Sequence, residues 1–258
     1  MITPVRRVVD AGNLFGLNFA RVLRSVQGIP KLVHDGIEYA RQSPPSSFQL
    51  KIRQLMPMLS DYRGSAGVAR GHYFHQDLWA ARKIFGRRPP RHLDVGSRID
   101  GFIAHLLVFM NVEVIDALPL KGRVAGLSFQ QGDARSLAGL KDNSIVSLSS
   151  LHAAEHFGLG RYSDPVDPWA HTKFMNSLER VLSSGGILYF SVPIGRERLE
   201  FNAHRIFDIS TILTQFKNLR LVSFSYVDDA GDFHEDVSPS DFPRTTSCGC
   251  GLFEFTKQ

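Results

Sequence analysis

Residues 92–101 read His92-Leu93-Asp94-Val95-Gly96-Ser97-Arg98-Ile99-Asp100-Gly101, a short apolar run that leads directly into a turn with two glycines. The run predicts a buried strand, and the apolar residues of 102–110 predict a helix after the turn. Gly96 and Gly101 let the backbone turn tightly and let a ligand approach it closely. In open α/β sheets, ligands bind beyond the carboxyl ends of the strands. This stretch therefore predicts a binding cleft after the first strand of such a sheet.

Further short apolar runs follow at intervals, separated by helical or turn-rich stretches, as expected for strands that alternate with helices. They lie at 112–116, 127–129, 144–148 and 186–192, and a helix is predicted before the first strand over 77–85. Runs at 221–227 and 251–256 come after this series and predict a final antiparallel hairpin at the sheet edge. The predicted fold is α/β, a doubly wound Rossmann-like sheet of about seven mostly parallel strands.

Three aspartates stand at the ends of successive strands, and together they indicate the ligand. Asp94 precedes the first glycine, where it would repel a pyrophosphate but could pair with an ammonium group. Asp116 ends the second strand and is placed to accept hydrogen bonds from ribose hydroxyls. Asp133 follows the third strand, beside Ala134, where it could bind an adenine amino group. A single aspartate in such a turn is common, so the ordered set of three is the signal.

Several segments resemble, as a set, the successive cofactor motifs of class I S-adenosylmethionine-dependent methyltransferases. They are 93–101, 113–116, 131–134 and 149–156, followed by 177–193, which is similar to the helix and fifth strand after those motifs. The resemblance covers residues 71–258. More narrowly, Gly158-Leu159-Gly160-Arg161-Tyr162-Ser163-Asp164-Pro165-Val166-Asp167-Pro168-Trp169 resembles a methyltransferase-like family, domain of unknown function 268.

The resemblance implies an S-adenosylmethionine site and assigns parts of it to particular residues. The resemblance implies that the turn with Asp94, Gly96 and Gly101 surrounds the methionine moiety. It implies that Asp116 binds the ribose and that Asp133 and Ala134 bind the adenine. The full cofactor set that we predict is Asp94, Gly96, Ser97, Gly101, Asp116, Asp133, Ala134 and Ser150. Ser97-Arg98 departs from the small or apolar residues often found there, which leaves the roles of these two open.

The candidate catalytic residues are His152, Glu155 and His156, directly after the fourth strand. A positioned base accelerates proton removal from an acceptor by about 10²–10⁴-fold. The same letters match H-x-x-E-H of zinc peptidases, but their place inside a cofactor-binding sheet argues against proteolysis. A helix would put both histidines on one face, so a divalent metal, with Asp164 or Asp167 as further ligands, is an alternative. The plainer alternative is that the histidines only hydrogen-bond the backbone.

The loop 158–169 is rich in Gly, Pro, Asp and aromatic residues. It is either an ordinary surface connection or a lid that binds the acceptor through Arg161, Tyr162 and Trp169. Aromatic residues beside acids suit a polyhydroxylated acceptor such as a glycan. From the other side, Tyr73, Phe74 and Gln76 either close over the cofactor or pack in the core, and His204 is a further candidate to face the cleft.

Residues 1–70 form a predicted helical extension or cap, and residues 71–258 the methyltransferase-like domain. Apolar residues at helical spacing, including Phe15, Phe19 and Val22, predict helices that Gly28-Ile29-Pro30 and Ser43-Pro44-Pro45-Ser46 interrupt. Their apolar face needs a partner surface, either the main domain or a second copy of the chain. A homo-oligomer through these helices is therefore one prediction.

Composition limits the setting and the partners. No apolar run reaches the roughly 18–20 residues that a membrane span needs, and residues 1–19 lack the apolar centre of a signal peptide. The two cysteines, Cys248 and Cys250, form a C-x-C in which a disulfide would be strained. We therefore expect a reducing, cytoplasmic setting. The net charge is +5, but the basic residues are scattered, so nucleic acid is not an expected partner.

The sequence thus predicts an S-adenosylmethionine-dependent methyltransferase acting on a small-molecule or glycan-linked hydroxyl. The alternative is a non-catalytic cofactor-binding or scaffold domain of the same fold. A nicotinamide-dependent oxidoreductase is disfavoured because the G-x-G-x-x-G fingerprint is absent. The three readings differ in whether His152, Glu155 and His156 are needed for function.

Overall fold

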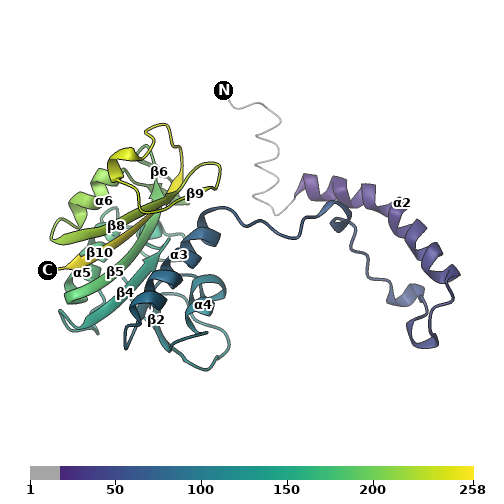
Figure 1. The fold of residues 1–258 in the computed structure, drawn as a ribbon, viewed down its shortest axis with the longest axis horizontal. Coiled ribbons are helices and arrows are strands. Elements are labelled where there is room, and N and C mark those ends of the chain that lie inside the picture. Colours follow the sequence, from purple (N-terminus) through teal and green to yellow (C-terminus); the bar gives the residue numbers. More distant parts are fainter. Residues whose placement is uncertain (1–17) are drawn as a thin grey trace. The chain divides into compact units, whose positions relative to one another are not determined.

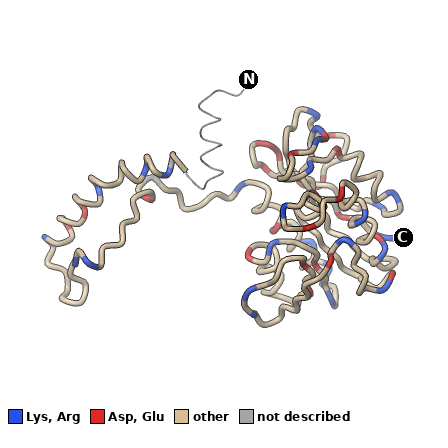
Figure 2. The backbone as a smooth tube through the Cα atoms, turned by 180° about the vertical axis from the view of Figure 1, so that it is seen from behind, with Lys and Arg blue, Asp and Glu red and all other residues tan. Residues whose placement is uncertain are grey.

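The computed structural model describes residues 18–258, which divide into two compact units at the boundary between Val68 and Ala69. The predicted helical positions around Phe15 lie outside the described residues. No helix in the described part of the chain is long and apolar enough to cross a membrane. Charged residues of both signs are interspersed along both units (Figure 2), in agreement with the scattered charge of the sequence.

The first unit contains one long helix, α2 (Phe19–Arg41), and three 3₁₀ turns at Ser46–Phe48, Ile52–Gln54 and Asp61–Arg63. The Asn18 side chain caps α2 by accepting a hydrogen bond from the Arg21 N–H. The predicted interruption at 28–30 is wrong, because α2 continues through Pro30. Gly28 is buried against the 55–60 segment, and a Cβ there would lie 2.2 Å from the Leu59 carbonyl oxygen. The close contact with Leu59, rather than a chain break, accounts for the glycine.

The second unit is an eight-stranded sheet with the order β3-β2-β1-β4-β5-β10-β8-β9 (Figure 1). Its strands are β1 (Leu93–Val95), β2 (Val112–Asp116), β3 (Leu127–Gln131), β4 (Ile145–Leu151), β5 (Leu182–Ile194), β8 (Leu219–Val227), β9 (Phe233–His234) and β10 (Gly249–Lys257). The first five strands are mutually parallel, and β10 runs antiparallel to both of its neighbours. The predicted fold class is confirmed.

The C-terminal strand differs from the prediction in its place. β8 and β10 form the predicted antiparallel pair beyond the parallel strands, but β10 is its inner strand, between β5 and β8, and the short β9 follows β8 at the edge. Eight of its nine residues are buried, which is typical of a strand with neighbours on both sides. A separate two-stranded ribbon, β6 (Arg198–Glu200) and β7 (His204–Ile206), follows β5. Its three-residue strands are too short to give a periodic signal in the sequence.

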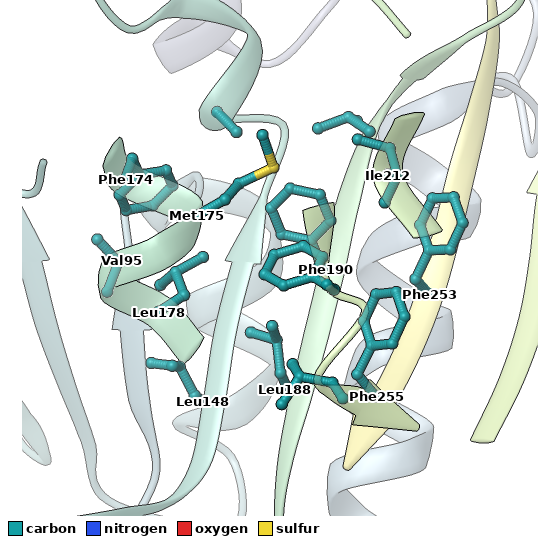
Figure 3. Packing of buried hydrophobic residues seen from close by; sticks show 14 of the residues in the cluster. Val95, Leu148, Phe174, Met175, Leu178, Leu188, Phe190, Ile212, Phe253 and Phe255 are labelled. Carbon is teal, nitrogen blue, oxygen red and sulfur yellow. The ribbon is translucent and has the colours of Figure 1, made fainter. Parts of the chain in front are cut away.

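Helices cover both faces of the sheet. The helices are α3 (His72–Arg87), α4 (Ala104–Leu106), α5 (Ala170–Val181) and α6 (Ile209–Gln215), with a π-helical turn at Ile99–Ile103 before α4 and 3₁₀ turns at Ala154–His156 and Pro239–Asp241. Residues of α5 and α6 pack on one face of the sheet, around Phe190 and Phe253 (Figure 3). Residues of α3 and α4 pack on the other face, around Tyr189 and Leu252. The predicted helix over 102–110 is shorter than expected, because its first residues belong to the π turn and α4 ends at Leu106.

Candidate functional site

A pocket of about 380 Å³ opens at the carboxyl ends of β1, β2 and β4. Its wall contains Gly96, Ser97, Asp116, Ala134 and residues that follow β4. Larger hollows lie along α5 and α6 and between α3 and β8. The pocket at the strand ends is the one in the position that open α/β sheets use for ligands.

The turn after β1 requires a glycine at its first position. Gly96 has φ +77°, and a Cβ added to it would lie 3.0 Å from the Ala153 Cβ. Its N–H donates to the Ile115 carbonyl at 3.0 Å, which ties the turn to the end of β2. Gly101 is needed for another reason, since a Cβ there would lie 2.3 Å from Asp77 Oδ2 on α3. Gly101 therefore does not line the pocket but allows α3 to approach the turn.

Asp94 lies beneath this turn and is fully buried. It accepts hydrogen bonds from the backbone and hydroxyl of Ser97 and from the hydroxyl of Ser149. Ser97 Oγ in turn accepts the Leu151 N–H at 2.9 Å, so this network joins the turn to β4. Burial raises the pKa of Asp94 to about 6, although the hydrogen bonds from Ser149 and Ser97 act in the opposite direction. The carboxylate holds the loop and does not border the pocket.

Asp116 lines the pocket at the end of β2, where its carboxylate accepts the Leu118 N–H at 2.8 Å. Partial burial raises the pKa of this carboxyl. After β3, Ala134 borders the pocket, whereas the Asp133 carboxylate turns to Arg135, 2.9 Å away. The hydrogen bond from Arg135 lowers the pKa of Asp133. Ser150 is buried within β4 and does not reach the pocket wall.

His152 directly follows β4 and has a backbone φ of +50°, a strained conformation for a residue with a side chain. Its N–H donates to the Ser191 carbonyl at 3.0 Å, which fixes the backbone there. Nδ1 of His152 lies 2.7 Å from Glu155 Oε1. Burial alone would lower the pKa of this imidazole, but the facing groups of Cys250 and Glu155 raise it well above its usual value. His152 and Glu155 thus form a buried pair beside the pocket.

His156 also lines the pocket, but its pKa shifts in the opposite direction from that of His152. Its Nδ1 lies 2.8 Å from the Ala203 carbonyl oxygen. Because a carbonyl only accepts hydrogen bonds, this contact favours the tautomer with its proton on Nδ1 and a lone pair on Nε2, although Arg161 Nη1 also lies 3.3 Å from Nδ1 and Glu155 Oε1 lies 3.7 Å from Nε2. Burial lowers the pKa of His156. The imidazole is therefore neutral at pH 7 and can accept a proton at Nε2.

The two histidines do not share a helix face, so that part of the metal prediction is wrong. Only Ala154–His156 form a 3₁₀ turn, and the left-handed backbone at His152 lies outside it. Asp164 accepts backbone N–H groups of its own loop, including that of Gly158 at 2.7 Å. Asp167 is 2.7 Å from Lys173 Nζ and does not border the pocket. Both acids thus already have partners that hold the loop.

Of the proposed lid residues, Tyr162 borders the pocket, and its ring meets the edge of His156 at a centroid distance of 5.7 Å. Arg161 donates to the Ala203 carbonyl, and Trp169 is 68% exposed outside the pocket. Tyr73 lines the opposite wall, under the guanidinium of Arg98 at 4.7 Å from its centroid. Phe74 borders the hollow beside β8 instead.

Two residues near the site, His72 and Cys250, belong to none of the cofactor or catalytic motifs that the sequence shows. His72 stacks on His152 with 5.5 Å between ring centroids, and Cys250 lies close to both. Cys250 was considered only for a disulfide with Cys248, and both thiols are free. Nearly a hundred residues separate His152 from Cys250 along the chain, and only the sheet order brings them together.

The fold defines the class of the second unit. It is similar to a protein of Galdieria sulphuraria assigned as a sarcosine dimethylglycine methyltransferase, with a TM-score of 0.52, 13% identity, and 71% of this chain and 86% of that chain covered. A Burkholderia thailandensis 1,6-didemethyltoxoflavin-N1-methyltransferase, with bound S-adenosylhomocysteine, matches with a TM-score of 0.50, 15% identity, and coverages of 71% and 78%. The [4+2]-cyclase SpnF matches with a TM-score of 0.50, 13% identity, and coverages of 70% and 80%. At these identities the similarity shows a shared fold alone, one that both methyltransferases and a cyclase use.

The narrower resemblance rests on the sequence itself. Residues 141–241 match the family model described as Caenorhabditis protein of unknown function, DUF268. This segment includes the loop 158–169 on which the predicted resemblance was based, so the resemblance is confirmed. No curated protein matches the sequence.

Proposed function

We propose that this chain is an S-adenosylmethionine-dependent methyltransferase that methylates a hydroxyl group of a small or glycan-linked acceptor. The observation that carries the proposal is Asp116, a partly buried carboxylate at the end of β2 that faces the pocket beside the Gly96 turn. A carboxylate in this position can accept hydrogen bonds from both hydroxyls of a ribose. The fold, which some methyltransferases share, supports the same assignment.

In this proposal the pocket divides into parts with different roles. The turn at Gly96 and Ser97 binds the methionine moiety, with Asp94 holding it from beneath. Asp116 binds the ribose, and the backbone at Asp133-Ala134 borders the adenine. Gly101 and Ser150 contribute by packing, since neither reaches the pocket wall. When bound, the cofactor supplies an electrophilic methyl group on a sulfonium.

For the acceptor, the chain must supply alignment and a base. His156 is the base of the proposal, because it lines the pocket and keeps a lone pair on Nε2. His152 and Glu155 position the end of β4 and the turn that carries His156. Tyr162, in contact with His156, offers a flat ring to a sugar or another polyhydroxylated acceptor. A reducing, cytoplasmic setting belongs to this proposal and agrees with two free cysteines.

A second candidate is a domain that keeps the fold without transferring methyl groups. The similarity to a [4+2]-cyclase supports this candidate, because the same fold has a different activity in that protein. Such a domain would tolerate the loss of His156 without losing its function.

The first experiment is calorimetric titration of the full chain with S-adenosylmethionine and S-adenosylhomocysteine. We expect micromolar binding that Asp116→Asn weakens at least tenfold, since its substitution leaves ribose hydroxyls without a charged acceptor. The matched control is Glu113→Gln, on the same strand, whose side chain pairs with Arg91 and does not line the pocket. Absence of binding to folded wild-type protein would overturn the proposal in favour of the second candidate.

A further inference from the structure

Three potential metal ligands from distant parts of the chain converge beside the pocket. His72 begins α3, His152 directly follows β4 and Cys250 lies in β10. One ligand atom of each side chain lies within 4.8 Å of the corresponding atoms of the other two. The imidazole rings are stacked, with an interplanar angle of 5°. Imidazole nitrogen and thiolate sulfur are the donors that zinc prefers.

The outer side of each imidazole is already held. His152 Nδ1 is 2.7 Å from Glu155 Oε1, and Glu155 is only 1% exposed. The His72 imidazole faces the backbone of Cys248, which acts to raise its pKa against the larger effect of burial. Metal-binding histidines almost always make such a bond through the nitrogen that does not touch the ion, because it fixes the ring orientation. Both rings therefore have the support that a metal ligand needs.

The inner side of the cluster lacks adequate partners. His152 Nε2 is buried and has no hydrogen-bond partner among the described residues, and its side chain is 6% exposed. Cys250 is 0% exposed, and among the described residues its Sγ has weak contacts with Gln76 Oε1 at 3.8 Å and the Gly251 carbonyl at 4.0 Å, and it faces the His152 imidazole. A buried polar atom without a partner costs about 1–3 kcal/mol. An ion between these atoms would satisfy them together.

The charge around the cluster also suits a cation. Glu155 lies directly behind His152, and Asp229 contributes a second negative charge near His72. Asp229 itself is fixed by the backbone N–H groups of Ser247 and Cys248, each at 2.8 Å. Two carboxylates and a thiolate would offset the charge of a divalent ion.

We propose that His72, His152 and Cys250 form a site for a divalent transition metal, with zinc as the ion that this donor set fits. Zinc bonds of ~2.0–2.3 Å place tetrahedral ligands about 3.3–3.8 Å apart, so the three side chains need to close by roughly 1 Å. Three protein ligands leave a fourth position for water or another group, as in catalytic rather than structural zinc sites. This site is distinct from the His152–His156 helix-face arrangement that the sequence suggested.

The site would connect to the pocket through His152, which belongs to both. An ion bound there would lie at the acceptor end of the pocket, where its fourth position could take an acceptor oxygen or sulfur. This role rests on the proposed function, whereas metal binding itself does not. The two can therefore fail separately.

The test is titration of the metal-stripped full chain with Co²⁺, followed by displacement with Zn²⁺. A thiolate ligand gives a sulfur-to-cobalt charge-transfer band in the near ultraviolet, and we expect one equivalent to produce it. Cys250→Ser should abolish the band, while Cys248→Ser, the matched control outside the cluster, should keep it. His72→Gln should retain the fold and weaken binding at least tenfold, because it removes one of three ligands.

The circular dichroism spectrum of each variant establishes whether it is folded. If the buried Cys250→Ser variant does not fold, the loss of metal affinity in His72→Gln tests the proposal instead. The proposal is overturned if folded wild-type protein gives no band and takes up no Zn²⁺. It is also overturned if the band survives in Cys250→Ser or disappears in Cys248→Ser. Calorimetry with S-adenosylhomocysteine on the same samples reports the cofactor site independently.

Discussion

At the scale of single residues, the site combines charged groups whose neighbours pull their pKa values in opposite directions. Against the effect of burial, the facing groups of Cys250 and Glu155 raise the pKa of His152, while burial lowers that of His156. A general base must be unprotonated at the working pH and must reach its substrate. Both histidines line the pocket, so the first criterion makes His156 the base of the proposed function and leaves His152 a supporting or metal-binding role.

The first prediction tests this division. His156→Gln should lower methyl-transfer turnover by about 10²–10⁴-fold, because the pocket loses its base. The affinity for S-adenosylhomocysteine should stay within about threefold, as the ribose and methionine contacts remain. His105→Gln, an exposed histidine on α4 outside the pocket wall, is the control. Equal turnover of His156→Gln and wild type in a steady-state assay would remove His156 from the mechanism.

A second residue-scale prediction concerns the buried pair His92 and Asp94. His92 hydrogen-bonds Ser147 and Ser149, and burial lowers its pKa to about 3. The unfolded chain therefore binds this proton first, and the contribution of His92 to stability is lost as pH falls from about 6.5 toward 3. Asp94 has a folded pKa of about 6, above its usual 3.8, so its contribution has the opposite sign and grows as pH falls from 6 to 3.8.

These two contributions offset each other in wild type between pH 6 and 4.5. Asp94→Asn removes one of them, so its unfolding free energy should fall more steeply with acid, by up to about 1.4 kcal/mol per pH unit. Urea denaturation at several pH values measures both slopes. Parallel curves for the variant and wild type would show that Asp94 is ionised throughout this range.

At the scale of elements, a single arginine fastens the connection between β3 and β4 to α5. Arg180, in the last turn of α5, donates to the carbonyl oxygens of Ser136, Leu137 and Leu140, and to Asp142. These contacts hold the chain that follows Ala134 at the pocket wall. Hydrophobic packing of α5 therefore determines where one side of the pocket lies.

Arg180→Ala should lower the unfolding free energy by about 2–3 kcal/mol, because several carbonyl groups lose a charged donor at once. Binding of S-adenosylhomocysteine should weaken as well, as the Ala134 wall loses its support. Denaturation and calorimetry measure the two effects, with Arg82→Ala, an exposed arginine on α3, as the control. A stability loss without any change in affinity would separate this loop from the site.

At the scale of the whole molecule, both hydrophobic cores lie within residues 69–258. In the first unit, large apolar side chains of α2 such as Val22, Leu23 and Val26 are more than half exposed. An isolated helix gains most of its stability from burial of an apolar face. The second unit thus has what it needs to fold alone, and the α2 face still needs a covering surface, for which a second copy of the chain stays a prediction.

A fragment of residues 69–258 should consequently unfold within about 3 °C of the full chain, a shift that corresponds to roughly 1 kcal/mol. Scanning calorimetry of the fragment and the full chain provides the comparison. A much lower unfolding temperature for the fragment would mean that residues 1–68 stabilise the second unit directly.

The sequence by itself determined the alternating strands, the Gly96 turn and the acidic strand ends, because these depend on local patterns of two to ten residues. It also indicated Asp116 and His156 as residues at the carboxyl edge of the sheet, because Asp116 ends one buried parallel strand and His156 lies in the short turn after another. It did not reveal that Asp94 lies beneath its loop, or that β10 lies inside the sheet. Those depend on which groups the fold brings into contact.

The convergence of His72, His152 and Cys250 was decided only by the tertiary structure. In the sequence, each of these residues is typical of an ordinary polar or small apolar position. No fixed spacing connects the start of α3, the end of β4 and the C-terminal strand β10. The insertion of β10 beside β5 and the packing of α3 against the sheet bring the three side chains together. Local pattern therefore specified the elements of this protein, and long-range packing specified the cluster beside its pocket.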